Sequence, residues 1–594
     1  MSTVKLKVAA LFKDDRSIKV RLLIAVIVNF LFAFTFIIFD PMEIFFFNPH
    51  DFIFGFSDFW WIMVLVAFAF VVIASVVIAL LKGVVFDMLV TSLFSLTVCS
   101  YIQRNFMNTD LNVLTGEPVE WSNNTWKYMV FLAIWLIAFI IPFVVRYFST
   151  VWWKNLITYG AGLLVTMQAV ALVFLLIVPQ GTYFENDKVN LNGYILRNAG
   201  MFELSEKNNV VVFITDYFDN CYLDEILNEN ANFLSPLKGF THFKNTASVY
   251  GRTYPSLEYL LTGKECFYDL PSEEYRQIAY AESPFLQDIF DAKFNIGLHT
   301  SNVHLTESAA DTVDNYRENV GPAKIRYSGK GIVKALLTCV AYRNAPSAMK
   351  ATFWFYAEDF NEFLLSSEQV SDDGSDDNLP SMIVMNDLLF YKRLTEHSLE
   401  VGAQGYDGCF RMYHMKGAHP PITYDESLKV NKGATRRQQS KGCFKIIYEY
   451  IRQLQEMGLY TNTTIIITAD HGAVRSNADL ASGKAVSPIL LVKPAGAGAD
   501  SELTFSNAPV SHSDFQATVI DAVGGDYKAY GNTFFEISEN EPRTRYFYMP
   551  DINSQGKETQ LLEYSIEGDV KNFSNWSLTG KEWAIKYSQY AIEN

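Results

Sequence analysis

The segment Asn208-Asn-Val-Val-Val-Phe-Ile-Thr-Asp216 decides the fold of the larger, C-terminal part of this chain. Its centre, Val210–Thr215, is an unbroken run of β-branched and aromatic residues, which is typical of a strand buried on both faces. Thr464–Thr468 (TIIIT) and Ser487–Val492 (SPILLV) repeat the pattern, and Phe444–Met457 between them has helical periodicity. Strands that alternate with helices predict an α/β domain with a mainly parallel sheet.

The end of the chain, residues 527–594, has a different pattern. Short runs rich in aromatic residues, such as Arg545–Met549 and Thr559–Ser565, are typical of strands paired in an antiparallel way. They predict a small antiparallel C-terminal unit added to the main sheet.

The beginning of the chain is much more apolar than the rest. A helix needs about 20 mainly apolar residues to cross the hydrocarbon core of a bilayer. Five stretches approach this requirement: Val20–Phe39, Trp60–Leu81, Val84–Ile102, Tyr128–Val145 and Tyr159–Val178. They predict a bundle of about five transmembrane helices.

Basic residues predict the orientation of this bundle, because loops rich in lysine and arginine stay in the cytoplasm. The N-terminal arm Lys5–Arg21 is basic, and Lys82, Arg146 and Lys154 fall in the loops expected on the same side. An odd number of spans then places the chain after Pro179 outside the cytoplasm.

These patterns divide the chain into five expected parts. They are a cytoplasmic basic arm (1–19), a transmembrane bundle (20–178), a linker (179–207), an α/β domain (208–526) and a C-terminal antiparallel subdomain (527–594). The formal net charge of −16 argues against nucleic acid as a partner.

Polar residues follow two of the predicted buried strands. Asp216 comes directly after Val210–Thr215, and Asp470 and His471 follow Thr464–Thr468 within the string TADHG. Parallel sheets bind ligands at the carboxyl ends of their strands, so we expect these side chains to converge. Two carboxylates and an imidazole suit a divalent metal ion, either zinc or manganese.

Thr253 is the candidate nucleophile for such a site. It lies at the start of a helical pattern that runs to Leu261 and ends at Thr262-Gly263. The unpaired N–H groups at a helix N-terminus favour an anion. A hydroxyl is a poor nucleophile, and coordination to the metal ion would activate it, so we expect Thr253 to hold the metal together with Asp216, Asp470 and His471. The neighbouring Arg252 is a candidate for pairing with a phosphate.

Together these strings resemble the alkaline phosphatase/sulfatase superfamily. Thr253-Tyr-Pro-Ser-Leu257 followed by LLTG is similar to the sulfatase signature C/S-x-P-S-R with LLTG. Thr253 cannot become formylglycine, and Leu257 replaces the signature arginine. A threonine at this place is instead similar to the lipoteichoic acid synthases and the lipid A phosphoethanolamine transferases, which are bacterial membrane enzymes with a phospho-threonine intermediate. These usually have Glu where this chain has Asp216.

The resemblance extends to two histidine motifs. Tyr413–Pro421 resembles a family segment whose second histidine contacts the substrate phosphate, which implies that role for His419. His414, the first histidine, is expected to pack inside. Val510–Asp514 resembles the later S-H-x-D element and implies a substrate-binding or structural role for His512.

The expected function is therefore metal-dependent transfer of a phospho-headgroup, phosphoglycerol or phosphoethanolamine, by a multi-pass enzyme of the bacterial plasma membrane with an extracytoplasmic catalytic domain. The donor is a membrane phospholipid and the acceptor a cell-surface glycan or glycolipid. Two alternatives stay open. One is a phosphate- or sulfate-ester hydrolase that uses the same site, and the other is a sensor or assembly protein on an inactive enzyme scaffold.

Overall fold

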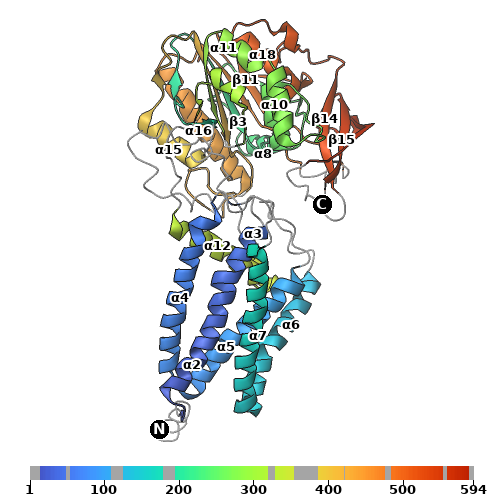
Figure 1. Ribbon diagram of the computed structural model, residues 1–594. Helices are drawn as coiled ribbons and strands as arrows, with labels where there is room; N and C mark the ends of the chain where they lie inside the picture. Colours follow the sequence, from blue (N-terminus) through green and yellow to red (C-terminus); the bar gives the residue numbers. More distant parts are fainter. Residues whose placement is uncertain are drawn as a thin grey trace. The chain divides into compact units, whose positions relative to one another are not determined.

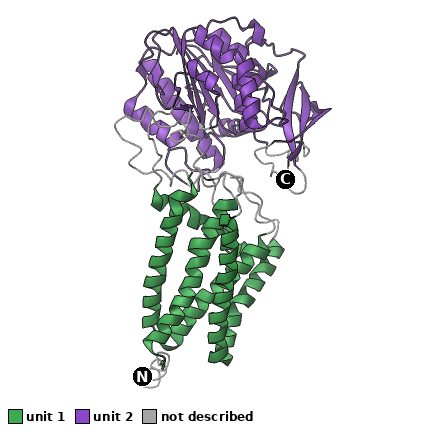
Figure 2. Ribbon diagram, viewed as in Figure 1, with its two compact units in different colours: residues 1–190, 324–370 green, residues 191–323, 371–594 purple. Residues whose placement is uncertain are grey.

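The computed structural model separates the chain into two compact units (Figures 1 and 2). Unit 1 comprises Met1–Asn190 and Lys324–Val370, and unit 2 comprises Leu191–Ala323 and Ser371–Asn594. The described residues are 14–47, 52, 54–108, 125–177, 194–300, 302–318, 328–353, 386–420, 422–431, 433–474, 480, 483, 485–552 and 558–587. Most of the expected basic arm and part of the expected linker lie outside these residues.

Unit 1 contains the five predicted apolar helices, which confirms this part of the fold. Its elements are α2 (Ile18–Ala33), the π-helix η1 (Phe34–Phe39), α3 (Asp40–Phe47), α4 (Phe56–Leu80), α5 (Gly83–Ile102), the π-helix η3 (Gln103–Met107), α6 (Thr125–Phe148) and α7 (Thr150–Ile177). In the described residues, 5 continuous helical stretches are long and apolar enough to cross a membrane. The first stretch continues through η1 and α3 to Phe47, beyond the predicted end at Phe39.

Asp87 is the one acidic residue inside the third predicted span, and it is buried. A buried carboxylate in an apolar bundle is costly unless it has a charged partner. Arg16 Nη1 lies 2.6 Å from Asp87 Oδ1, and Arg146 also pairs with Asp87. The two arginines explain how the third helix accommodates this charge.

Unit 1 also includes a segment from far along the sequence. The helix α12 (Gly329–Asn344) and the 3₁₀ helix η6 (Ser347–Phe353) belong to it, although the sequence pattern predicts that residues 324–370 belong to the α/β domain. Ile332 and Leu336 of α12 are buried in one apolar cluster with Phe45 and Phe59. The chain therefore passes between the two units more than once.

A polar cluster joins α12 to the first and third apolar helices. Asp40, at the start of α3, forms a buried ion pair with Arg104 of η3. Asn344 at the end of α12 donates from Nδ2 to Asp40 Oδ2 at 2.6 Å, and Arg343 Nη1 lies 2.6 Å from Glu43 Oε2. Because buried charges need partners, this cluster fixes α12 in one place on the bundle.

Unit 2 is built on a 7-stranded sheet with the order β12-β4-β11-β10-β3-β9-β6. Its strands are β3 (Asn208–Thr215), β4 (Thr241–Phe243), β6 (Phe294–His299), β9 (Gly408–Met415), β10 (Thr463–Thr468), β11 (Leu490–Lys493) and β12 (Thr504–Ser506). Only β11 runs antiparallel to its neighbours, so the sheet is mainly parallel, as predicted.

Helices cover both faces of this sheet (Figure 1). They are α8 (Asn220–Glu229), α9 (Thr253–Thr262), α10 (Ser272–Glu282), α11 (Phe285–Asp291), α15 (Asp387–His397), α16 (Arg436–Glu456) and α18 (Phe515–Ala522). Alternate residues of β3 enter opposite cores: Val212 packs in the cluster with α9, α11 and α18, and Val211 packs in the one with α8, α15 and α16. This two-sided burial is the reason that β3 lacks polar residues at alternate positions.

The C-terminal unit is a 3-stranded antiparallel sheet, which confirms the sequence prediction. Its strands are β14 (Thr544–Ile552), β15 (Glu558–Glu567) and β16 (Trp576–Ala584). Shorter elements of unit 2 are β1 (Tyr194–Leu196), β2 (Glu203–Leu204), β5 (Thr246–Ala247), β7 (Tyr316–Glu318), β8 (Glu400–Val401), β13 (Val510–Ser511), η5 (Glu307–Asp311), η9 (His512–Asp514), η10 (Tyr527–Tyr530) and η11 (Phe573–Asn575).

Replacing Asn344 with leucine should loosen α12 from the bundle. The substitution removes the amide donor to the buried Asp40, and a hydrogen bond to a charged group contributes about 1.5–3 kcal/mol. We expect a lower unfolding temperature and faster thermolysin cleavage within residues 328–353 of the full-length protein. Lys330→Ala, which changes an exposed residue of the same helix, is the control. Equal cleavage of both variants and the wild type would contradict the proposed attachment of α12 through this polar cluster.

Candidate active site

Three side chains from the ends of two neighbouring strands form a candidate metal centre. Asp216 follows β3, and Asp470 and His471 follow β10, which pairs in parallel with β3. One ligand atom from each residue lies within 4.8 Å of the other two. His471 Nε2 is 3.5 Å from Asp470 Oδ2 and 3.9 Å from Asp216 Oδ1. The structure thus brings together three of the four residues predicted to hold the metal ion; the fourth is Thr253.

The local backbone orients Asp470 and His471 toward one point. Asp470 Oδ1 accepts hydrogen bonds from the backbone N–H of Tyr217 at 3.0 Å and of His471 at 2.8 Å. His471 Nδ1 lies 2.9 Å from the carbonyl oxygen of Gly472, which can only accept a hydrogen bond. Nδ1 therefore carries the proton, and the Nε2 lone pair faces the two carboxylates, as a metal ligand requires.

The electrostatics of Asp470 also suit a ligand. Burial alone would raise its pKa, but the neighbouring rings of His471 and His414 and the Thr253 hydroxyl lower the pKa of Asp470 below its ordinary value. The carboxylate form is thereby favoured. Two carboxylates and an imidazole in a buried cluster repel further negative charge and attract a cation, so the donor set fits a divalent ion such as zinc or manganese.

Asp216 is fixed by an unusual turn after β3. Its N–H donates to Met415 O at 3.0 Å, and its carbonyl accepts from Ala418 N at 2.9 Å. The next residue, Tyr217, has a φ of 61°, a left-handed conformation that is strained for a residue with a large side chain. Such strain persists only where the surroundings impose it, and here the Tyr217 N–H holds Asp470 in place.

Thr253 is the first residue of α9, where the sequence places a helix N-terminus. Its Oγ1 lies 3.5 Å from His471 Nε2. The hydroxyl therefore shares the space enclosed by the three ligands. The N–H groups of the first turn of α9 point toward the same end of the helix, which suits an anionic group there.

Two further histidines border this centre. His414, at the end of β9, is buried with Nε2 3.7 Å from Asp216 Oδ2. His512 lies 3.3 Å, measured from Nε2, from the Thr468 hydroxyl oxygen. Burial lowers the pKa of each to about 4, so both rings are neutral at physiological pH. His414 was expected only to pack inside, and its nearness to Asp216 follows from the pairing of β9 with β3.

The other two candidate residues from the sequence are His419 and Arg252. The ring of His419 contacts the edge of Tyr217, with centroids 5.8 Å apart, and Tyr217 in turn contacts His471, with centroids 5.5 Å apart. His419 is thus one aromatic ring away from the metal ligand. Arg252 Nη2 lies 2.6 Å from Glu558 Oε1, so its charge is engaged by β15 of the C-terminal unit.

Asp219 holds the backbone near the metal ligands in place, although it was not among the predicted site residues. Its Oδ2 accepts hydrogen bonds from the N–H groups of Ala473 and Ser487, each at 3.0 Å, and its Oδ1 accepts from Cys221 at 2.8 Å. It therefore fixes the loop that carries His471. The only signal in the sequence is its position just beyond Asp216, which is also typical of a helix N-cap.

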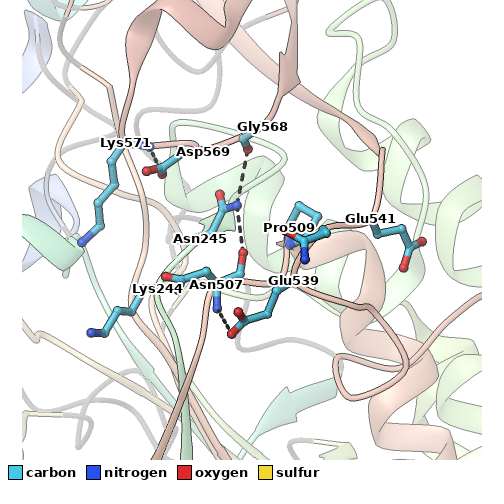
Figure 3. A pocket seen from close by; sticks show the side chains of 10 residues that line it. Lys244, Asn245, Asn507, Pro509, Glu539, Glu541, Gly568, Asp569 and Lys571 are labelled. Atoms are coloured by element: carbon cyan, nitrogen blue, oxygen red, sulfur yellow. Dashed lines mark hydrogen bonds between the residues drawn. The ribbon is translucent and has the colours of Figure 1, made fainter.

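A separate polar pocket of about 410 Å³ lies elsewhere in unit 2 (Figure 3). It is lined by Lys244, Asn245, Asn507, Pro509, Glu539, Asn540, Glu541, Gly568, Asp569 and Lys571. Asn245 donates from Nδ2 to the carbonyl oxygens of Asn507 and Gly568, and the backbone N–H of Asn507 donates to Glu539 Oε1, as the dashed lines in Figure 3 show. None of the lining residues belongs to the candidate metal centre.

Comparison with known proteins gives fold-level likenesses. No protein-family model and no curated protein matches the sequence. Similar solved structures include a protein in the alkaline phosphatase superfamily from Vibrio parahaemolyticus, with 12% identity, TM-score 0.35 and coverage of 67% of this chain and 86% of that one. The zinc complex of the C-terminal periplasmic domain of EptC from Escherichia coli has 10% identity, TM-score 0.32 and coverage of 58% and 92%.

A phosphonate monoester hydrolase from Silicibacter pomeroyi is also similar, with 13% identity, TM-score 0.34 and coverage of 64% of this chain and 89% of that one. The protein from Vibrio parahaemolyticus is described as a member of the superfamily that the sequence motifs resemble.

Zinc or manganese should stabilise the full-length protein in detergent. An ion that binds only the folded state at 100 times its Kd contributes about 2.7 kcal/mol, so we expect a clear rise in unfolding temperature. Asp470→Ala should remove most of this rise, because it deletes a buried ligand. Asp521→Ala, an exposed carboxylate on α18, should leave it intact. A wild-type protein unaffected by either metal would contradict the assignment.

Gly472→Ala should weaken metal binding without touching a ligand. A methyl group there would lie 2.5 Å from Asp219 Oδ2, so either the Asp219 carboxylate or the loop that it holds, which carries His471, has to shift. Loss of a group that orients a ligand typically costs 10–100-fold in affinity, roughly what we expect in a chelator competition. Gly498→Ala is the matched control, since its added methyl meets nothing closer than 3.7 Å. Equal affinities in the two variants would refute this role.

Proposed function

We propose that this protein transfers a phospho-headgroup from a membrane phospholipid to a hydroxyl group of a cell-surface glycan or glycolipid, through a phosphate ester on Thr253. The observation that carries the proposal is the position of the Thr253 hydroxyl, 3.5 Å from His471 Nε2 at the N-terminus of α9. The headgroup is phosphoglycerol or phosphoethanolamine.

The first half-reaction forms the covalent intermediate. Thr253 Oγ1 attacks the phosphorus, and the bond between phosphorus and the diacylglycerol oxygen breaks. Diacylglycerol leaves as the free alcohol with the proton that the threonine has lost. A divalent ion held by Asp216, Asp470 and His471 would favour the ionised hydroxyl and offset charge on the phosphoryl oxygens.

The second half-reaction releases the headgroup to its acceptor. A hydroxyl of the acceptor attacks the same phosphorus, the bond to Thr253 Oγ1 breaks, and the acceptor proton returns to the threonine. The chain's own residues hold the phosphate during both steps. The N–H groups that begin α9 face its oxygens, and His419 borders the site beside Tyr217.

The apolar helices of unit 1 support the choice of a lipid donor. A membrane anchor keeps an enzyme at the surface that contains its phospholipid substrate, and it raises the local concentration of that substrate. The basic loops support an orientation with unit 2 outside the cytoplasm. The resemblance of the motifs to those of bacterial membrane enzymes supports a location in the plasma membrane of a bacterium.

Thr253→Ala should abolish transfer because the nucleophile is lost, while Asp216, Asp470 and His471 remain to bind a metal ion. Thr253→Ser keeps a hydroxyl and should retain part of the activity. The measurement is release of labelled diacylglycerol from phospholipid vesicles, together with the mass added to residues 253–264 in the intact protein. Full activity of the alanine variant would end the proposal, and diacylglycerol release without a modified acceptor would favour the hydrolase alternative.

A further inference from the structure

A half-buried arginine stands one aromatic ring away from the metal centre. Arg436 is the first residue of α16, and its guanidinium carbon lies 4.9 Å from the ring centroid of Tyr222 and 5.4 Å from that of Tyr217. It donates from Nη1 to the Tyr222 hydroxyl at 2.9 Å and from Nε to Ala418 O at 3.2 Å. These contacts fix the plane of the guanidinium.

The two tyrosines connect this cation to the reaction centre. Tyr217 follows the ligand Asp216, and its ring meets His471 at an interplanar angle of 85°. The same ring meets His419 at 84°. Arg436 also bonds to the carbonyl of Ala418, the residue before His419. The guanidinium therefore borders the side of the site where His419 lies.

The charge of Arg436 is not balanced in the way that surface arginines usually are. In the described residues Arg436 makes no ion pair, whereas Nε of its neighbour Arg437 lies 3.5 Å from Glu229 Oε2. Asp219, which acts on the same Tyr222 ring as Arg436, is engaged elsewhere, because it accepts three backbone N–H groups. A guanidinium group held in this way still has N–H groups that can donate to a ligand.

The placement of this charge distinguishes the two candidate headgroups. Both present the same phosphate, but phosphoglycerol ends in neutral hydroxyls and phosphoethanolamine ends in an ammonium group. A guanidinium donates hydrogen bonds to hydroxyl oxygens and repels an ammonium group, and in a partly buried site this repulsion is weakly screened.

We propose that Arg436 is a specificity-determining residue, and that the site takes a phosphate ester of a neutral polyol in preference to one of a cationic amine. This inference rests on the proposed function, because it concerns the group attached to the phosphorus that Thr253 would attack. It assigns the donor to the phosphatidylglycerol type.

The test measures binding of two small phosphates to the full-length protein in detergent, loaded with manganese or zinc. The probes are glycerol phosphate and phosphoethanolamine, and the quantity compared is the ratio of their Kd values by calorimetry. We expect the wild type to bind glycerol phosphate about tenfold more tightly, a factor equivalent to about 1.4 kcal/mol. Arg436→Gln should bring the ratio near one.

Two further variants separate recognition from folding. Arg437→Gln removes the same charge from the adjacent position and should keep the wild-type ratio. Arg436→Lys keeps the charge but loses the planar contacts with the tyrosines, and it should retain part of the preference.

Each outcome of these binding measurements either supports or overturns the role of Arg436. A purely structural role for Arg436 would weaken both ligands equally in the glutamine variant and leave the ratio unchanged, which would overturn the inference. A wild type without preference, or one that prefers phosphoethanolamine, would also overturn it. Since no turnover is needed, this result is independent of whether Thr253→Ala abolishes transfer, the test of the proposed function itself.

Discussion

The candidate site in unit 2 depends on one constraint, the parallel pairing of β3 with β10. Because these strands are neighbours with the same direction, their carboxyl ends bring Asp216 beside Asp470 and His471. Two buried carboxylates at this separation are unfavourable alone and become favourable when a cation lies between them. The candidate site is therefore a consequence of sheet topology as much as of residue type.

Several parts of the structure serve to hold this arrangement in place. Asp219 accepts backbone N–H groups from the loop that carries His471, and Tyr217 adopts a strained conformation while its N–H binds Asp470. Gly417 has a φ of +56°, and a methyl group at this position would lie 2.7 Å from the backbone N of Asp216. Preorganised ligands of this kind do not have to rearrange when charge develops during a reaction.

Unit 1 shows a second use of buried charge. Asp40 directly follows the π-helix η1, and its partner Arg104 lies in the π-helix η3. Asn344 completes the cluster from α12, a helix that lies in the sequence between two parts of unit 2. Irregular turns and ionisable residues in an apolar bundle are expensive, so they persist where they hold a specific geometry. Here that geometry is the attachment of α12.

The sequence by itself determined the apolar helices, the mainly parallel sheet, the antiparallel C-terminal strands and the identity of the residues that converge. These follow from local chemistry: uninterrupted apolar stretches favour the bilayer, β-branched runs such as Val210–Thr215 favour buried strands, and Asp216, Asp470 and His471 stand directly after such strands.

Only the tertiary structure decided that His414 borders Asp216, that α12 belongs to unit 1, and that Arg436 stands beside Tyr217. These contacts join residues up to hundreds of positions apart. They depend on strand order, on the direction of a helix and on the packing of side chains in three dimensions. No periodicity or spacing along the chain records them, because local propensity fixes the elements and long-range packing fixes which of their faces meet.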